Sequence, residues 1–372
     1  MKPLPLADLR PLDPLPVTPR PAGFALWEMG FRPFFLGAAL WAAAGALVWP
    51  WLFGAGRPLP AGLDPLFWHR HEMLFGFTSA VICGFLLSAP GSWTGLPMPR
   101  GRPLAALFLL WVAGRLCMAA PACPPGLAMA VNVPLLPLMA GMAVVPVLRK
   151  HQWRNAALLV LPCALAAVQA AMHLGRMGVL PGATLWAGDA ALMLILVLIS
   201  VMGGRIMPFF TSRGLGLPPP KPLVVLNWAA PVTLLVASAL HIAGAPAGAR
   251  EAAWLLAGVT AAVRLIRWYR PGILGNPLLW SLHAAFAFLV AGCLLQTLSA
   301  AGWVAFPLAR HALTVGCIGL VCMSMMSRVS ADTPDGRCAS TPPPCSPCAS
   351  CSSRVLYACS SRSPFPPSTS RP

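Results

Sequence analysis

The sequence predicts an all-α polytopic membrane protein: a bundle of about ten transmembrane helices with a cytoplasmic N-terminus. Of its 372 residues, 58% are hydrophobic and 9% are charged, whereas soluble globular domains carry about 25% charged residues. Apolar windows of about 20 residues, the length that crosses a bilayer, recur along the chain. The net charge of +17 comes from basic residues placed singly between apolar runs, which indicates loops at a lipid bilayer and argues against a nucleic-acid partner.

Ten windows have the length and composition of membrane spans. Gly and Pro residues punctuate the breaks between them, as at 54–60, 90–103 and 121–125. In chain order, the predicted spans lie at 31–53, 67–89, 103–120, 126–148, 155–175, 184–208, 222–244, 251–268, 276–299 and 307–328.

The charges between the spans predict their orientation. The N-terminal segment and the loops after the even-numbered spans together carry 15 Lys and Arg residues, whereas the loops on the opposite side carry 4. Cytoplasmic loops of membrane proteins carry the excess of positive charge. The N-terminus is therefore predicted to be cytoplasmic.

The chain divides into three predicted segments: a Pro-rich cytoplasmic segment at 1–29, a transmembrane domain at 30–330 and a tail at 331–372. The 42 residues of the tail include 10 Ser, 9 Pro and 5 Cys, with no run that could span or pack. Two interpretations are open, a disordered tail and a coding sequence read out of frame, and the abrupt change of composition favours the second.

One cysteine motif lies in this tail. Cys345, Cys348 and Cys351 have the C-x2-C-x2-C spacing that begins an iron–sulfur ligand run. The fourth ligand at the expected spacing is missing, so the motif does not predict a cluster.

Ionisable side chains inside membrane spans are costly, and their default interpretation is functional. Five of the seven His and several charged residues are predicted to lie at one depth near the outer leaflet. These residues are His69, Arg70, His71, Glu72, Arg115, His173, Asp189, His241 and His311. His283 lies at a different depth, about 10 Å from the inner end of its span at a rise of about 1.5 Å per residue.

This polar layer predicts a metal or haem site, because imidazole is the commonest metal ligand and suits haem iron, copper and zinc. At about 100° per residue, His69 and His71 project in nearly opposite directions and are expected to serve different sites. Glu72 shares a helix face with His69, so we expect it to orient that ring or to act as a ligand. His71 is expected to be the axial ligand of a haem packed between helices.

Other members of the layer leave alternatives open. The expected partner of Asp189 is another imidazole ring, Arg115 or Arg176. For His241 and His283 taken singly, a plain hydrogen-bonded helix contact is an alternative to cofactor binding.

Several strings of the sequence resemble one family of membrane proteins. They are GFRPFFLGAALWA (Gly30 to Ala42), WHRHEMLFGF (Trp68 to Phe77), SWTGLPMPRGRPLAALFLLWVAGRL (Ser92 to Leu116), GGRIMPFFT (Gly203 to Thr211), LLWSLHAAFAFLVAG (Leu278 to Gly292) and RHALTVGCIGLVCMSMMSRVS (Arg310 to Ser330). By these strings the chain resembles the NnrS family, and the resemblance is nearly continuous from about Gly23 to Ser330.

The resemblance implies a bacterial inner-membrane protein of about twelve helices that contains haem b and copper. It also implies a role in the response to nitric oxide and nitrosative stress during denitrification, with nitric oxide or a nitrosylated metal species as partner. The matching strings carry His69, His71, Glu72, His283 and His311 as candidate cofactor residues.

The resemblance and the polar layer together give the expected site. Its cofactor-binding residues are His69, His71, His173, His241, His283 and His311; metal is assigned to His69, His71 and His311, and a supporting role to Arg70, Glu72, Arg115 and Asp189.

Two features depart from the family pattern. Arg70 stands between the two His residues where the family usually has a small residue. After Ser330 the family continues with a GHTGR-like segment and two further helices, whereas this chain reads ADTPDGR at 331–337. The second departure agrees with a tail read out of frame.

Two other functions stay open. A secondary transporter or proton-coupled permease would relay protons through the same His residues, Asp189 and Glu72, although no internal repeat is evident. A structural or assembly protein would use its His residues only as helix contacts. No Walker loop, dinucleotide fingerprint, catalytic triad or HExxH motif is present, so no enzymatic reaction is assigned.

Overall fold

The computed structural model describes residues 25–54, 64–120, 122–218 and 220–331, and all regular elements within these ranges are helical. The predicted all-α class is confirmed. The predictions for 1–24 and for the tail from 332 onward, including its reading frame and its cysteine motif, lie outside the described residues.

The N-terminal helices carry six of the nine residues of the predicted polar layer. After a short turn, η2 (Leu26–Glu28), the elements are α1 (Phe31–Gly54), α2 (Pro65–His71), η4 (Glu72–Phe77), α3 (Thr78–Leu86), α4 (Ala89–Thr94), α5 (Arg102–Ala119), α6 (Pro125–Asn132), α7 (Leu135–Arg149), α8 (Trp153–Ala156), η5 (Ala157–Leu159) and α9 (Val160–Arg176).

The C-terminal helices carry the other three residues, Asp189, His241 and His311. They are α10 (Ala183–Leu215), α11 (Val224–Ile242), α12 (Ala247–Trp268), η6 (Ile273–Gly275), α13 (Pro277–Ala300), α14 (Phe306–His311), η7 (Ala312–Gly319) and α15 (Leu320–Ala331).

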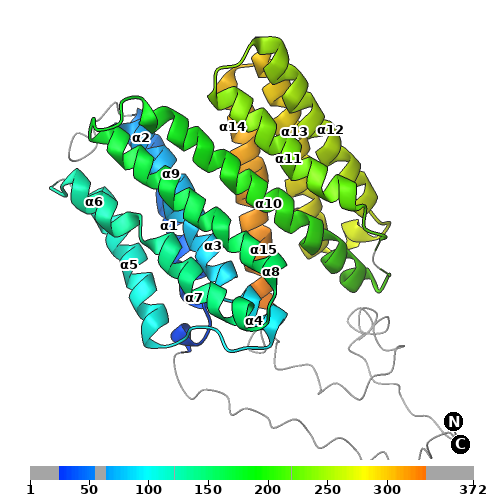
Figure 1. The fold of residues 1–372 in the computed structure, drawn as a ribbon, viewed down its shortest axis with the longest axis horizontal. Coiled ribbons are helices and arrows are strands. Elements are labelled where there is room, and N and C mark those ends of the chain that lie inside the picture. The colour runs from blue at the N-terminus through cyan, green and yellow to red at the C-terminus, as the bar shows by residue number, and fades with distance from the viewer. Residues whose placement is uncertain (1–24, 55–63, 121, 219, 332–372) are drawn as a thin grey trace, which may run out of the picture. The chain divides into compact units, whose positions relative to one another are not determined.

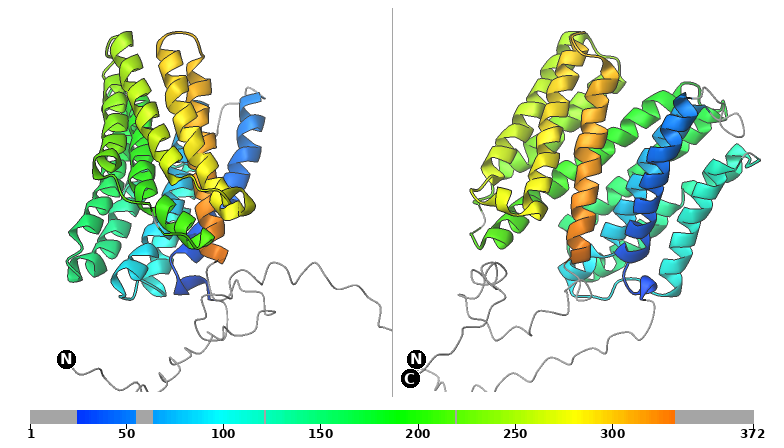
Figure 2. Two further views of the ribbon diagram at one scale, coloured as in Figure 1. Left: turned by 90° about the vertical axis from the view of Figure 1, so that its right-hand side faces the viewer. Right: turned by 180° about the vertical axis from the view of Figure 1, so that it is seen from behind.

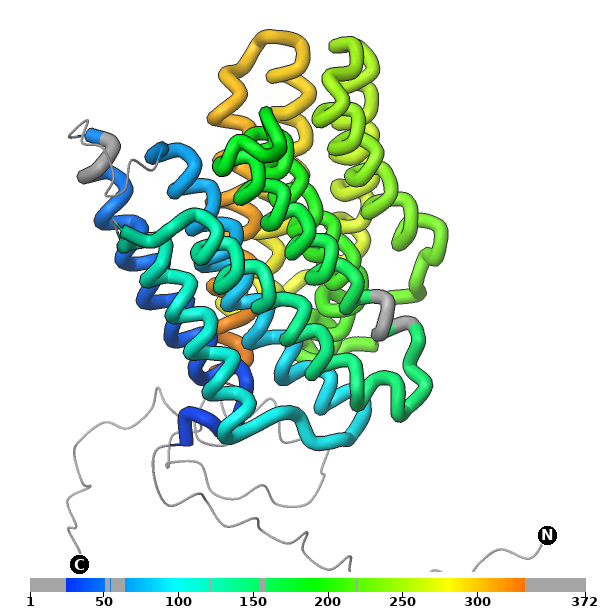
Figure 3. The backbone as a smooth tube through the Cα atoms, turned by 60° about the vertical axis from the view of Figure 1, so that its left-hand side comes forward, coloured from blue at the N-terminus to red at the C-terminus, as the bar shows by residue number. Residues whose placement is uncertain are grey.

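The helices up to Arg328 form two groups joined through α10. Figure 1 shows α1 to α9 on one side and α11 to α13 on the other, with the long helix α10 crossing between them. α10 packs against both α9 and α11. The segment from α14 to α15, drawn in orange in Figure 2, lies between the two groups, and η7 contacts α13 and α10. Figure 3 shows the backbone passing back and forth between two opposite edges of the bundle.

Each of the ten predicted spans corresponds to a helical segment. Among the described residues, eight of these segments are long and apolar enough to cross a membrane. The other two are α9, which has 17 residues, and α12, which contains Arg250, Glu251, Arg264 and Arg267. α9 is therefore slightly too short to count among these eight segments, and α12 contains too many charged residues.

Two helices change from α to π geometry directly after a histidine. α2 ends at His71 and continues as the π-helix η4, and α14 ends at His311 and continues as the π-helix η7. The same pattern, Pro-Leu-x-x-His, lies near the start of both helices, at 65–69 and at 307–311. In α14 its His is the last residue before the π turn, and in α2 it lies two residues before the end of the α-helix. π-Helical turns are rare and frequently lie at functional sites, so these two helix starts are structurally related positions of interest.

Candidate metal centre

Two histidines from different helices meet in the interior of the N-terminal group. Nε2 of His71, at the end of α2, lies 3.1 Å from Nε2 of His173, near the end of α9. Both residues are 0% exposed. The side-chain amide of Gln169, one turn before His173, places its Nε2 3.2 Å from the same His71 nitrogen. Three polar groups therefore converge on one buried point.

A chain of buried hydrogen bonds fixes the His71 ring. Glu72 Oε1 accepts a hydrogen bond from His71 Nδ1 at 2.8 Å, and Glu72 Oε2 accepts one from Arg115 Nη1 at 2.5 Å. Arg115 Nη2 donates to Oδ1 of Asn132, and Asn132 Nδ2 donates to the carbonyl oxygen of Ala128 at 2.8 Å. Because Glu72 holds the proton on Nδ1, Nε2 of His71 presents a lone pair toward His173.

Glu72 was expected to face His69, and this prediction is wrong. The expectation assumed about 100° per residue through the whole segment, but the helix passes into π geometry at Glu72. At this point the carboxylate contacts the neighbouring His71 ring and Arg115 from α5. The pairing of Asp189 with Arg115 or Arg176 is wrong as well, because Asp189 pairs with Arg310.

The pair of imidazoles fits a metal ion. Two nitrogens bound at about 2.0 Å to one ion with a tetrahedral angle lie about 3.3 Å apart, close to the 3.1 Å between His71 and His173. A carboxylate on the far ring nitrogen is the usual support of a metal-bound imidazole. Nδ1 of His173 is buried without a hydrogen-bond partner, so this ring lacks the support that Glu72 gives to His71.

The other predicted metal ligands lie apart from this pair. The His69 ring stacks on Trp49, with centroids 4.1 Å apart, and its Nδ1 is buried without a hydrogen-bond partner. His311 is exposed, and its Nδ1 donates to the carbonyl oxygen of Pro307 at 2.6 Å. In the described ranges no three His, Cys, Asp or Glu side chains gather as a metal-ligating group, so His69, His71 and His311 do not form one cluster.

His283 has the hydrogen-bonding pattern of an axial ligand. Its Nδ1 donates to the carbonyl oxygen of Leu279 at 2.9 Å, one turn earlier in α13. Its Nε2 is buried without a hydrogen-bond partner. The ring is thus oriented by the backbone and offers one unused lone pair, although it lies in a different helix group from His71 and His173.

The remaining polar residues gather between α10, α11 and α14. Asp189 pairs with Nη2 of Arg310, and its Oδ2 lies 3.8 Å from Nε2 of His241. The His241 ring stacks on Phe306 with centroids 5.2 Å apart. The single polar layer expected from the sequence is therefore divided among several places, of which only one holds two facing imidazoles.

A comparison with known families shows to which family the chain belongs. The sequence model of one family, described as NnrS protein, matches residues 25–346. The chain belongs to the NnrS family. No curated protein and no solved structure matches.

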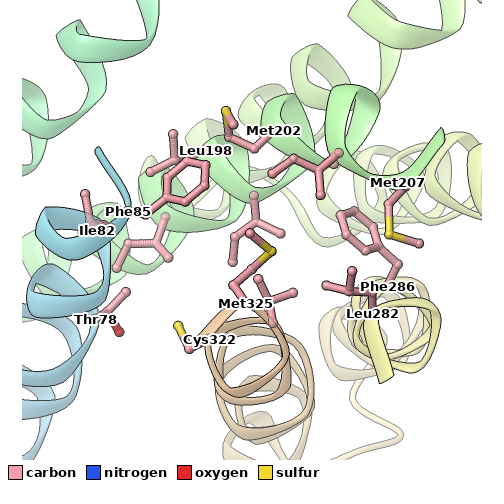
Figure 4. A pocket seen from close by; sticks show the side chains of 15 residues that line it. Thr78, Ile82, Phe85, Leu198, Met202, Met207, Leu282, Phe286, Cys322 and Met325 are labelled. Carbon is pink, nitrogen blue, oxygen red and sulfur yellow. The ribbon is translucent and has the colours of Figure 1, made fainter. Parts of the chain in front are cut away.

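The NnrS chain also contains an apolar cavity of about 90 Å³ between α3, α10, α13 and α15. Figure 4 shows sulfur atoms of Met202, Met207, Cys322 and Met325 among the side chains that surround it. His283 does not line this cavity, although its neighbour Leu282 does. The cavity offers soft, apolar walls and no imidazole.

Sequence reasoning missed two residues of the His71 environment in this NnrS protein, Gln169 and Asn132. They are 2% and 4% exposed and make the contacts described above. It also missed Trp49, which stacks on the separate His69 ring. A side-chain amide in the middle of an apolar span is the signal that points to such residues, because an unpaired polar group is costly in a membrane.

Proposed function

We propose that this NnrS family member binds copper and haem b in the bacterial inner membrane and acts in the response to nitric oxide. The observation that carries the proposal is the 3.1 Å approach of Nε2 of His71 to Nε2 of His173, with Glu72 on the other nitrogen of His71. Two facing ring nitrogens in an apolar interior are costly unless a proton or a metal ion lies between them.

Copper is the metal that we assign to His71 and His173. Imidazole suits this metal, and Gln169 adds a third polar group at the same point. Bound copper would supply a one-electron couple and an open position for nitric oxide. The protein's own contribution is to hold the His71 ring in one tautomer, through Glu72 and Arg115, and to keep water away from the pair.

His283 is the residue that we assign to haem, which it would hold through its unpartnered Nε2. His69 and His311 lie close enough to each other to interact electrostatically, but at a different depth from His283, so we assign them to a separate cofactor position. Nδ1 of His311 is already bound to the backbone, as is Nδ1 of His283, so both rings present Nε2 for coordination.

Metal content of the purified full chain tests the assignment. We expect copper in the wild type, at least a tenfold loss of copper in His71→Ala and His173→Ala, and an unchanged dithionite-reduced Soret band in both. His283→Ala should lose the Soret band and keep copper. The matched control is His151→Asn, in the exposed turn between α7 and α8. Wild-type protein without copper, or equal copper in His173→Ala and His151→Asn, contradicts the proposal.

A further inference from the structure

A polar cavity of about 290 Å³ lies where α10, α11, α12, α13 and α14 come together. Its lining includes Asp189, His241, Arg250, Gln296 and Phe306. A cavity of this size accommodates a molecule of several heavy atoms together with water. None of the residues that surround His71 and His173 lines it, so the cavity is separate from the proposed copper site.

The charges at this cavity do not balance. Asp189 is already paired with Arg310, whose guanidinium also lies over the Phe306 ring, 4.2 Å from its centroid. Arg250 lines the cavity, and within the described part of the chain no carboxylate forms an ion pair with it. Counting His241 as neutral, Asp189, Arg310 and Arg250 together carry one excess positive charge, and Arg70, which interacts electrostatically with Arg310, adds to it.

Hydrogen-bond donors at the cavity are also unused. Gln296 is 2% exposed, and its Nε2 has no hydrogen-bond partner in the described residues. The Nε atoms of Arg250 and Arg310 are likewise buried without a partner. Buried donors without acceptors are uncommon in native proteins and are usually met by an ordered water or a bound ion. Because the unused groups are donors beside excess positive charge, their chemistry suits an anion and not a cation.

We propose that this cavity binds a small monovalent oxyanion, with Arg250 as its charge partner and the Gln296 amide as a second donor. Asp189 occupies Arg310 and so limits the site to one negative charge. Phe306 and the His241 ring stacked on it form an apolar and aromatic wall against which a planar anion fits. This site is additional to the proposed metal chemistry and does not depend on it.

Calorimetric titration of the purified full chain with sodium nitrite and with sodium formate, at constant ionic strength, tests the proposal. We expect at least one of these two anions to bind saturably, with one anion bound per chain. Arg250→Gln and Gln296→Leu should each weaken binding about tenfold or more, the loss expected for a hydrogen bond to a charged group. Asp189→Asn should have the opposite effect, about tenfold tighter binding, because it frees Arg310. A residue that only supports the fold would not give changes of opposite sign.

Two further variants separate binding from folding. Arg102→Gln changes an exposed arginine at the start of α5 and should bind as the wild type does. Arg250→Lys keeps the charge and should retain most of the affinity that Arg250→Gln loses. Copper content should stay at the wild-type level in all of these variants. The proposal is overturned if neither anion binds the wild type saturably, or if Arg250→Gln binds as tightly as Arg102→Gln.

Discussion

At the scale of single residues, Glu72 determines the geometry of the buried pair. It is 0% exposed and divides its two oxygens between His71 and Arg115, which come from α2 and α5. A buried charge is tolerated only when it is paired and hydrogen-bonded. Arg115 is only 4% exposed and depends on Glu72 and Asn132 for its partners. The two charged side chains are therefore mutually required.

The first prediction concerns this ion pair. Glu72→Gln should lower the free energy of unfolding by about 3–5 kcal/mol, because it leaves the Arg115 charge uncompensated in the interior. Denaturation of the purified protein by increasing sodium dodecyl sulfate measures the change. Glu28→Gln, at an exposed carboxylate before α1, is the control and should be neutral.

A double variant identifies the cause. In Glu72→Gln with Arg115→Met no buried charge remains, so we expect it to be more stable than Glu72→Gln alone. Additive losses in the double variant would show that the two side chains stabilise the protein independently, contrary to the prediction.

Sequence reasoning at this scale found most of the polar residues but not their partners. The depth of His71 and His173 in their spans is set by helix length and orientation, so a common depth is predictable from the sequence. The partner of Glu72 is not predictable in this way, because it depends on a π turn that begins at that residue. The pairing of Arg310 with Asp189 is not predictable from the sequence either, because it depends on how α10 and α14 pack.

At the scale of secondary structure, the π-helix η4 depends on close packing around Gly76. The carbonyl oxygen of Gly76 accepts a hydrogen bond from Trp111 Nε1 at 2.9 Å. A Cβ atom at this position would lie 2.7 Å from Oε2 of Glu72 and 2.8 Å from Nε1 of Trp41. These distances are well below normal van der Waals contact, about 3.5–4.0 Å between carbon atoms. The absence of a side chain at Gly76 therefore allows Glu72 and Arg115 to approach each other.

The second prediction follows from this packing. Gly76→Ala should destabilise the protein by about 1–3 kcal/mol, the usual cost of overpacking, and should lower copper content because it displaces Glu72. Denaturation in sodium dodecyl sulfate and metal analysis measure the two effects.

The matched control is Gly141→Ala in α7, where an added Cβ meets nothing within 4 Å. In that helix the substitution should stabilise by about 0.5–1 kcal/mol. Equal effects at the two positions would contradict a specific role for Gly76.

At the scale of the whole molecule, the number of membrane crossings depends on α9 and α12, the two helices that are not among the eight long apolar segments. α9 has 17 residues, or about 26 Å at about 1.5 Å per residue, slightly less than a hydrocarbon core of about 30 Å. The charges of α12 lie near its ends, and Arg264 is buried, with its guanidinium donating to the hydroxyl and the carbonyl oxygen of Ser200, each at 2.9 Å. Neither helix therefore exposes an unpaired charge along its middle.

The sequence predicted the helices well at this scale because hydropathy and loop charge act over whole segments. Each of the ten windows became a helical segment. The hydrogen bond from Arg264 to Ser200, sixty-four positions earlier, could not be predicted from the sequence, because it depends on how α10 and α12 pack. Composition alone therefore underrates α12 as a membrane span.

The last prediction is that both α9 and α12 span the membrane, with the N-terminus cytoplasmic. Alkaline phosphatase and green fluorescent protein, fused after Gln152, Gly178, Gly244 or Gly272, report the side of each turn. We expect fluorescence after Gln152 and Gly272 and phosphatase activity after Gly178 and Gly244, because positive charge is concentrated on the cytoplasmic side. Fusions after Gly216 and Gly244, on either side of α11, serve as the control pair and must differ. If Gln152 and Gly178 report the same side, α9 does not cross, and His173 could not reach His71 from the outer end of a span.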